Sequence, residues 1–420
     1  MSNQVLSIII FMATYLLLIK FRGKALYIVW GSAILLLTMR VITPAWALNA
    51  INWNVLGIFF GTMVLAELFV YSGAPAYLAT IMLNRTHNGT WALVTIIAFA
   101  GILSAVIENV ATVFIVAPLA LEIARKLKIS PVPIIISIAV AANLQGVATM
   151  IGDSPSIILA TAAKMTFMDF FWMQGRLGIF FAVQLGAIVS SLIVYYLFRN
   201  AQNKLPKNTI PVVLSWGPSI LIVLLILTLA LSSFIPSRPE TLPGIISATI
   251  GIMALLWNYR AGYFKLELVK LDWQTFFLLA GLFVLVSSLT SSGAIDSLAS
   301  KMLSASGGST LTAYIIIILV SMAISAFVDN IPYTLAMLPV SQIMAEKMGV
   351  NPLLFMFALV LSASLGGNIT PIGASANVTA VGMLRRQGYT VTFLDFFRIG
   401  FPVTIAAVTA GTIFIWVVWS

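Results

Sequence analysis

The sequence contains no cysteine, one histidine and few charged residues. The absence of cysteine excludes disulfides, thiolate metal sites and cysteine nucleophiles. Charged residues make up only 8% of the 420 residues, whereas soluble domains carry about 25%. This composition excludes a water-soluble enzyme. The single histidine, His87, lies in a basic loop and is interpreted as a surface residue.

Hydrophobic residues make up 61% of the chain. They form about ten apolar stretches of about 15–20 residues, the length that crosses the hydrocarbon of a bilayer. The sequence therefore predicts an all-α polytopic membrane protein. Residues 5–18 have no basic residue before them and no small-residue cleavage site after them. We interpret this first stretch as a retained helix and not as a signal peptide.

The apolar stretches follow the same order in both halves of the chain. Spans are predicted at 4–19, 25–39, 55–72, 179–198, 213–231, 243–258, 274–290 and 399–418. Pairs of apolar runs separated by a short polar tip predict re-entrant hairpins at 91–123 and 312–345. Helices interrupted by glycine and proline are predicted at 133–164 and 352–384.

The net charge of +10 comes from basic residues in short loops, which indicates a positive-inside topology and not nucleic-acid binding. If the loop with Lys20 is cytoplasmic, sixteen of the 22 basic residues share that side: Lys20, Arg22, Lys24, Arg85, Arg125, Lys126, Lys128, Arg199, Lys204, Lys207, Arg260, Lys265, Lys270, Arg385, Arg386 and Arg398. Both termini are then external. Each half crosses the membrane five times, so the second half enters in the opposite sense.

The repeat is also visible in the residues themselves. Trp53 and Gly61 recur 220 positions later as Trp273 and Gly281. Asn109 precedes Gly152 by 43 residues, and Asn330 precedes Gly373 by 43. Matched polar residues are not explained by a general likeness of apolar helices. We therefore predict two inverted repeats, 1–205 and 206–420. Inverted repeats with broken helices are typical of secondary transporters, whose solute site lies at the repeat interface.

The two breaks are the predicted binding region. Glycine weakens a helix and proline removes a backbone donor, so Gly146, Gly152, Pro155, Gly367 and Gly373 are predicted to interrupt the helices. Freed backbone groups deep in a membrane need protein, water or a ligand as partner. A simple packing kink is the alternative. The candidate solute-binding residues are Asn109, Thr112, Thr149, Asn330, Asn368, Thr370, Ser375 and Asn377.

Four acidic residues fall within the predicted hydrocarbon region: Glu67, Glu108, Asp153 and Asp329. A charge at that depth costs about 3 kcal/mol, so acids there are usually functional. Desolvation favours the protonated form of a carboxyl group, which suits proton coupling. The alternative is that each acid pairs with a local donor and never titrates. No Lys or Arg is predicted at the tips or breaks, which favours a neutral hydroxylated solute or a cation over an anion.

These segments resemble the ion transporter superfamily, in particular the branch with the arsenical pump membrane proteins and the P protein of melanosomes. The resemblance rests on the tips at Glu108-Asn109 and Asp329-Asn330 and on the breaks at 148–156 and 365–377. Related dicarboxylate transporters carry Ser-Asn-Thr at both tips, where it helps to bind sodium. Here an acid replaces the Ser, and Val110 and Ile331 replace the Thr. We infer that protons take over the role of sodium.

The resemblance implies a scaffold domain and a transport domain that moves in an elevator-like way, within a homodimer. It also implies efflux of arsenite or antimonite across the cytoplasmic (inner) membrane in exchange for protons, with no cofactor or metal. One alternative is a sodium/proton antiporter or another ion-coupled anion transporter. Another is the membrane subunit of an ATP-driven arsenite pump, which would need a soluble ATPase subunit because the chain has no phosphate-binding loop.

Overall fold

The computed structural model describes residues 3–203, 206, 209–262 and 271–420. Four residues predicted to be cytoplasmic, Lys204, Lys207, Lys265 and Lys270, lie outside the described residues, as does residue 205 at the predicted repeat boundary. The described chain is almost entirely helical, with one two-residue strand pair, β1 (Trp172–Met173) and β2 (Arg176–Leu177). The predicted all-α class is confirmed.

The first half contains ten α-helices and two short 3-10 turns among its described residues. They are α1 (Asn3–Lys20), η1 (Arg22–Lys24), α2 (Ala25–Thr38), α3 (Pro44–Ala50), α4 (Trp53–Tyr71), α5 (Ala74–Asn84), α6 (Gly89–Ser104), α7 (Asn109–Leu127), α8 (Val132–Gly146), α9 (Ser154–Ala162), η2 (Met168–Phe170) and α10 (Ile179–Phe198). The predicted hairpin corresponds to α6 and α7, and the predicted broken helix to α8 and α9.

The second half repeats this order after residue 216. Its described elements are α11 (Gly217–Ser232), α12 (Leu242–Ala261), α13 (Trp273–Ser291), α14 (Ala294–Ala305), α15 (Thr310–Ser325), α16 (Asn330–Met348), α17 (Pro352–Gly366), η4 (Gly367–Ile369), α18 (Ser375–Arg386) and α19 (Phe393–Trp419). The hairpin here is α15 with α16, and the broken helix is α17 with α18. That the two halves cross the membrane in opposite senses stays a prediction.

Several predicted boundaries were wrong. The last span begins at Phe393 and not at 399, because Thr392 and Asp395 form a capping box that starts the helix earlier. The span predicted at 213–231 begins at Gly217, after Trp216. Three helices were missed: α3, α5 and α14 have only 7, 11 and 12 residues, too short to be recognised by a search for membrane-spanning stretches.

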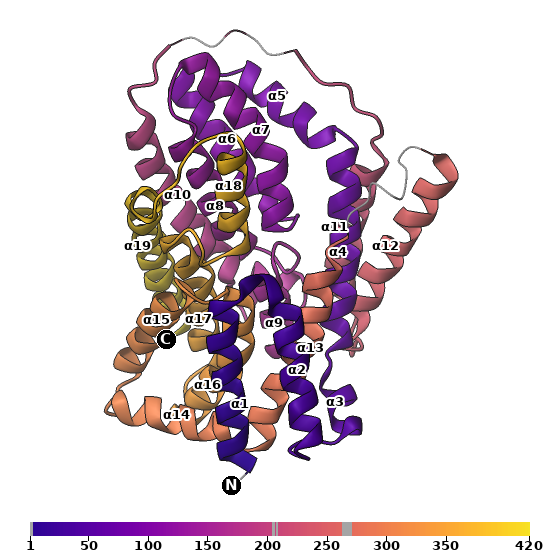
Figure 1. Cartoon of the computed structure of the whole chain (residues 1–420), viewed down its shortest axis with the longest axis vertical. Helices are drawn as coiled ribbons and strands as arrows, with labels where there is room; N and C mark the ends of the chain where they lie inside the picture. Colours follow the sequence, from indigo (N-terminus) through magenta and orange to yellow (C-terminus); the bar gives the residue numbers. More distant parts are fainter. Residues whose placement is uncertain (1–2, 204–205, 207–208, 263–270) are drawn as a thin grey trace.

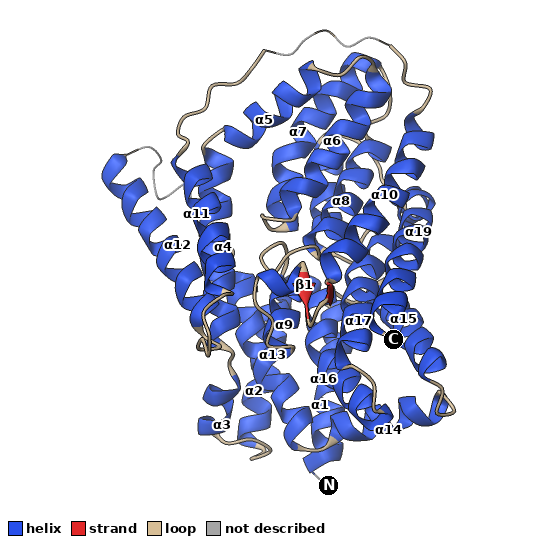
Figure 2. Cartoon of the chain, turned by 180° about the vertical axis from the view of Figure 1, so that it is seen from behind, coloured by secondary structure: helices blue, strands red, loops and turns tan. Residues whose placement is uncertain are grey.

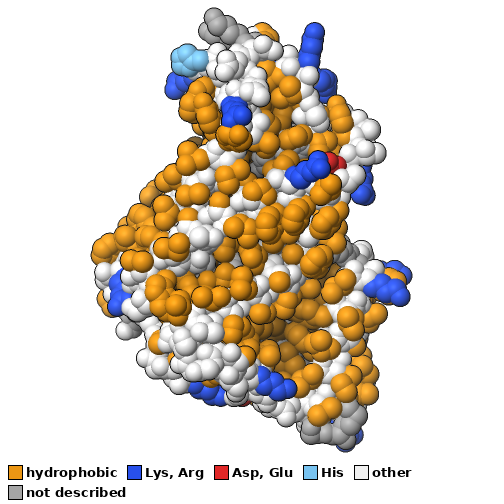
Figure 3. Space-filling view, turned by 90° about the vertical axis from the view of Figure 1, so that its left-hand side faces the viewer, with side chains coloured by type: hydrophobic (Ala, Val, Ile, Leu, Met, Phe, Trp, Pro, Cys, Tyr) orange, Lys and Arg blue, Asp and Glu red, His pale blue; other side chains and the backbone are white. Residues whose placement is uncertain are grey.

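Seven of the described helices are long and apolar enough to cross a membrane: α1, α4, α10, α12, α13, α17 extended by η4, and α19. An eighth is counted if α14 and α15, which meet at 117°, form one bent span. Helices α2 and α11 have 14 and 16 residues, shorter than the about 20 of a usual span. The predicted count of five crossings in each half therefore stays a prediction. Figure 3 shows wide areas of hydrophobic side chains with scattered Lys and Arg, as expected of a lipid-facing surface.

The helices divide into two groups that pack side by side. We call α1, α2, α4, α11, α12 and α13 the frame helices, and α6–α10 with α15–α19 the core helices. In Figures 1 and 2, α4, α11 and α12 lie on one flank, and α10 and α19 on the other. The frame is built on α12 against α4 and α13 against α2. The core helices are joined by the pairs α10 with α19, α6 with α8, α15 with α17 and α16 with α17.

Glycines allow the frame helices to approach closely. A methyl group on Gly57 would lie 2.7 Å from the carbonyl oxygen of Gly244, and one on Gly61 would overlap the backbone of Ser247. These contacts advance in the same direction along both helices, so α4 and α12 run parallel. A methyl group on Gly281, the predicted repeat partner of Gly61, would lie 2.6 Å from the side chain of Val29 on α2.

Candidate functional site

Each hairpin tip carries an acid that begins the second helix of the hairpin. Glu108 Oε2 accepts hydrogen bonds from the backbone N–H groups of Val110 at 3.1 Å and Ala111 at 3.4 Å. Asp329 Oδ1 accepts one from Ile331 N at 3.1 Å. A carboxylate in this position satisfies backbone donors that a helix start leaves unpaired. The acids are therefore held in place by their own helices.

The two breaks interrupt the α-helices at 147–153, between α8 and α9, and at 367–374, between α17 and α18, where the second break begins with the 3-10 turn η4. Their glycines are required by close packing. A methyl group on Gly146 would lie 2.5 Å from Asn109 Oδ1, and one on Gly373 would meet the Gly367 backbone. Pro155 lies in the first turn of α9, where no N–H is needed. It therefore starts the second half-helix, and the break itself ends before it.

Each break is fastened to its own hairpin tip by a threonine. Thr149 Oγ1 donates a hydrogen bond to the Ala105 carbonyl, and Thr370 Oγ1 donates one to the Ala326 carbonyl. Both bonds join residues 44 positions apart. The two predicted half-sites therefore share one internal construction.

A chain of buried amides connects the two breaks. Asn109 Nδ2 donates to Asn143 Oδ1 at 3.1 Å, and Asn143 Nδ2 donates to Asn368 Oδ1 at 2.7 Å and Asn377 Oδ1 at 3.0 Å. Asn377 in turn donates to the carbonyls of Gly367 and Thr370. The structure thus brings three predicted residues together across the repeats. Sequence reasoning missed Asn143, although it is an amide within an apolar helix that leads into the break.

Asp153 begins α9 deep inside the protein. Its Oδ1 accepts hydrogen bonds from Ser156 N at 3.1 Å and from Ser156 Oγ at 2.9 Å, and its side chain interacts with Asn109. Only 4% of Asp153 is exposed, and Ser154 and Ser156 are also buried. The first break is therefore closed to solvent in this conformation.

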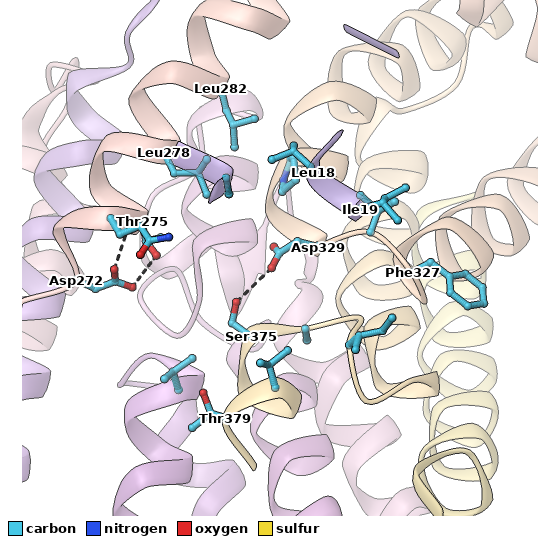
Figure 4. A pocket seen from close by; sticks show the side chains of 18 residues that line it. Leu18, Ile19, Asp272, Thr275, Leu278, Leu282, Phe327, Asp329, Ser375 and Thr379 are labelled. Carbon is cyan, nitrogen blue, oxygen red and sulfur yellow. Dashed lines mark hydrogen bonds between the residues drawn. The ribbon is translucent and has the colours of Figure 1, made fainter. Parts of the chain in front are cut away.

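The second break, in contrast, borders an open cavity of about 380 Å³. Ser375 is exposed and donates a hydrogen bond to Asp329 Oδ2 at 3.2 Å (Figure 4). Val110, next to Glu108 at the other tip, lines the same cavity, so both tips reach one space. Its described polar lining residues are Asp272, Gln274, Thr275, Asp329, Ser375 and Thr379, with no Lys or Arg among them.

Asp272 is the acid that sequence reasoning missed. It begins α13, where its two oxygens accept hydrogen bonds from Thr275 N at 3.0 Å and Thr275 Oγ1 at 2.6 Å. Figure 4 shows it across the cavity from Asp329. The available signal was its position directly before Trp273, the start of a repeated segment. It lies just before the span predicted at 274–290 and was therefore not counted among the acids in the hydrocarbon region.

The other predicted residues lie in different surroundings. Thr112 and Asn330 are buried behind the tips, 0% and 6% exposed. Glu67 lies on the frame helix α4, outside the cavity lining and the amide chain. The structure therefore gathers eleven of the twelve predicted binding and coupling residues at the tips and breaks, and separates Glu67 from them.

Hairpin tips, broken helices and a cavity that holds two aspartates, all inside a bundle of apolar helices, define an integral multi-pass membrane transporter and not an enzyme. Residues 13–359 match the family of citrate transporters, CitMHS. The chain belongs to this family, which is part of the ion transporter superfamily. The match does not single out the arsenical pump branch.

Relatives and solved structures agree with this assignment. An uncharacterized transporter of Mycobacterium tuberculosis is 29% identical over 98% of both chains. The human P protein is 26% identical over 86% of this chain and 53% of its own length. The YdaH transporter of Alcanivorax borkumensis has a similar fold, with a TM-score of 0.58 at 16% identity over 87% of this chain and 84% of that one. MtrF of Neisseria gonorrhoeae, described as one of a class of antimetabolite efflux pumps, has a TM-score of 0.59 at 14% identity, covering 91% and 83%.

Proposed function

We propose that this transporter exports a small uncharged hydroxylated solute across the cytoplasmic membrane in exchange for protons, with arsenite or antimonite as the leading substrate. The observation that carries the proposal is the cavity lining: two carboxylates, Asp272 and Asp329, with Glu108 at the adjoining tip, and no described Lys or Arg. An anion would meet like charge in a low dielectric there. A neutral triol such as As(OH)3 would not.

The polar groups around the cavity and the breaks suit such a solute. Hydroxyls and amides can both donate and accept hydrogen bonds. We propose that Ser375, Thr370 and Thr149, with the amides Asn109, Asn330, Asn368 and Asn377 and the hydroxyl of Thr112, form the two half-sites. Glu108, Asp153 and Asp329 would carry the protons. Glu67 is a weaker candidate, because it lies on a frame helix away from the cavity.

The same carboxylates also favour a second candidate, a sodium/proton antiporter or another ion-coupled transporter. Carboxylate, hydroxyl and carbonyl oxygens are the ligands that hard cations prefer. A bound cation would also allow an organic anion such as citrate, the substrate named for the family, to enter as a complex.

A pump subunit with a soluble ATPase partner is the third candidate. An elevator-like movement of the core helices within a homodimer completes the proposal.

Transport by purified protein in vesicles separates these candidates. We expect arsenite counterflow that is driven by an imposed pH gradient and is indifferent to sodium. Sodium movement without arsenite would favour the antiporter, and uptake of citrate that needs a divalent cation would favour the anion carrier. Transport driven by a pH gradient alone would exclude an obligate ATPase. Sodium-dependent, pH-indifferent transport would overturn proton coupling.

A further inference from the structure

A second set of contacts joins the frame and the core helices away from the open cavity. It connects the loop 233–240, between α11 and α12, with the segment 161–168, which contains the end of α9 and the residues after it. Arg238 Nη2 donates a hydrogen bond to the Met165 carbonyl at 3.0 Å, and Met168 N donates one to Ser233 Oγ at 3.3 Å. We call these two segments, with the contacts between them, the latch.

An exposed ion pair also joins the two segments of the latch. Lys164 Nζ lies 2.9 Å from Glu240 Oε1. Burial lowers the pKa of the Arg238 guanidinium, and the neighbouring carboxylate of Asp169 opposes that shift, which places an acid of the core segment beside an arginine of the frame loop. The two segments therefore meet through opposite charges as well as through hydrogen bonds.

The backbone on both sides of the latch is held in an uncommon conformation. Lys164 and Ser237 both have a φ of +53°, in the left-handed region that residues other than glycine rarely adopt. Such conformations persist where surrounding contacts fix them. Here they direct Met165 and Arg238, the next residues along each chain segment, into the hydrogen bond that joins them.

The predicted topology separates the latch from the open cavity. The loop of Lys20, which follows the cavity-lining residues Leu18 and Ile19, is predicted to be cytoplasmic, whereas Lys164 and Arg238 are not among the basic residues predicted on that side. The latch and the cavity are therefore predicted to face opposite sides of the membrane.

A second, smaller space of about 290 Å³ lies between the latch and the first break, and the latch residues Lys164, Arg238 and Glu240 line it. Its lining includes Met150 in the break, Asn54 at the start of α4, and Ile58, which is fully buried. Asn54 also bonds across the gap, from Nδ2 to Thr161 Oγ1 at 3.5 Å. The latch residues therefore separate the first break from the face of the protein opposite the cavity.

We infer that the latch is a gate that closes the transport site toward that opposite face, and that Arg238 positions it. Release of Arg238 from Met165 and of Lys164 from Glu240 opens the second space and gives the first break access to solvent. This inference rests on the proposed function only in that a transporter must expose its site to both faces in turn.

The absence of cysteine from the chain allows a direct test. A cysteine placed at the buried Ile58 reports opening of the space behind the latch through its labelling by a membrane-impermeant maleimide. We expect Arg238→Ala to increase the labelling rate of Ile58→Cys by about fivefold or more, because a charged hydrogen bond is lost. Glu240→Lys is expected to increase it about two- to fivefold. Lys301→Ala, an exposed basic residue on another helix, serves as the control and is expected to change nothing.

Two further variants keep the test independent of folding and of solute identity. The exchanged pair Lys164→Glu with Glu240→Lys is expected to restore slow labelling. A Lys164→Cys and Glu240→Cys pair, joined by a short cross-linker, is expected to block labelling at position 58 and to stop transport until the link is cleaved. Unchanged labelling in Arg238→Ala, or full transport by the cross-linked protein, would overturn the gate. If the labelling rate of Ile58→Cys changes with the latch variants as expected but the protein shows no arsenite counterflow, the gate is supported and the proposed substrate is contradicted.

Discussion

Asn143 Nδ2 donates a hydrogen bond of 2.7 Å to Asn368 Oδ1, which joins side chains 225 positions apart in the sequence. Both residues are fully buried or nearly so, at 1% and 0% exposed. The bond connects the helix that leads into the first break with the second break itself. The two half-sites are therefore joined by a direct hydrogen bond between buried side chains.

Replacing Asn143 tests this connection. Asn143→Ala removes one hydrogen-bond partner from each of the buried amides of Asn109, Asn368 and Asn377, so we expect a loss of about 1–3 kcal/mol in stability and a large loss of transport. Thermal unfolding in detergent and vesicle counterflow measure the two effects. The control is Ser137→Ala on the same helix, whose hydroxyl bonds only to the Pro133 carbonyl one turn away. An equal effect of both variants would contradict a special role for Asn143.

Asp153→Asn tests proton coupling. The amide oxygen can still accept hydrogen bonds from Ser156 and begin α9, so the protein is expected to fold normally. An amide does not take up or release a proton near neutral pH, so arsenite counterflow should no longer respond to a pH gradient. The matched control is Asp296→Asn, an acid in the first turn of α14. Unchanged coupling in Asp153→Asn would remove this residue from the proton pathway.

A labelling experiment tests which face the cavity opens to. Val378 lines the cavity and is 48% exposed, whereas Ser154, the first residue of α9 after the closed break, is 5% exposed. The basic residues predict that the loop of Lys20 and the start of α13, which border the cavity, are cytoplasmic. An impermeant maleimide should therefore modify Val378→Cys rapidly in inside-out vesicles and slowly in intact cells, with Ser154→Cys slow in both. Faster labelling of Val378→Cys from outside would reverse the predicted orientation.

Gly61 tests the packing of the frame. A methyl group on Gly61 would overlap the Ser247 backbone of α12, so Gly61→Ala is expected to destabilise the protein by about 1–3 kcal/mol. Gly31 on α2 has no atom within 4 Å of the corresponding position, and Gly31→Ala is expected to be neutral or slightly stabilising. Thermal unfolding of the two variants in the same detergent compares them. Similar melting temperatures would show that α4 and α12 can separate at little cost.

The sequence by itself determined the class of the protein and most of its helices. Hydrocarbon can be crossed only by long apolar helices, so composition and the lengths of the apolar stretches predicted the all-α membrane fold. Glycine and polar residues within such stretches located both tips and both breaks, because regular helix fails there. Short amphipathic helices such as α5 and α14 were missed because they do not need to be long or uniformly apolar.

Only the tertiary structure decided which residues meet and which side is open. Hydrogen bonds between Asn143 and Asn368, and between Arg238 and Met165, join segments far apart in sequence, and no local pattern encodes such contacts. Asp272 lines the cavity because the start of α13 lies beside the second hairpin tip. The two half-sites are nearly alike in sequence, yet of the repeat partners Ser154 and Ser375 the first is buried and the second is exposed. That difference arises from the position of the core helices against the frame, which is a property of the assembled conformation and not of either segment.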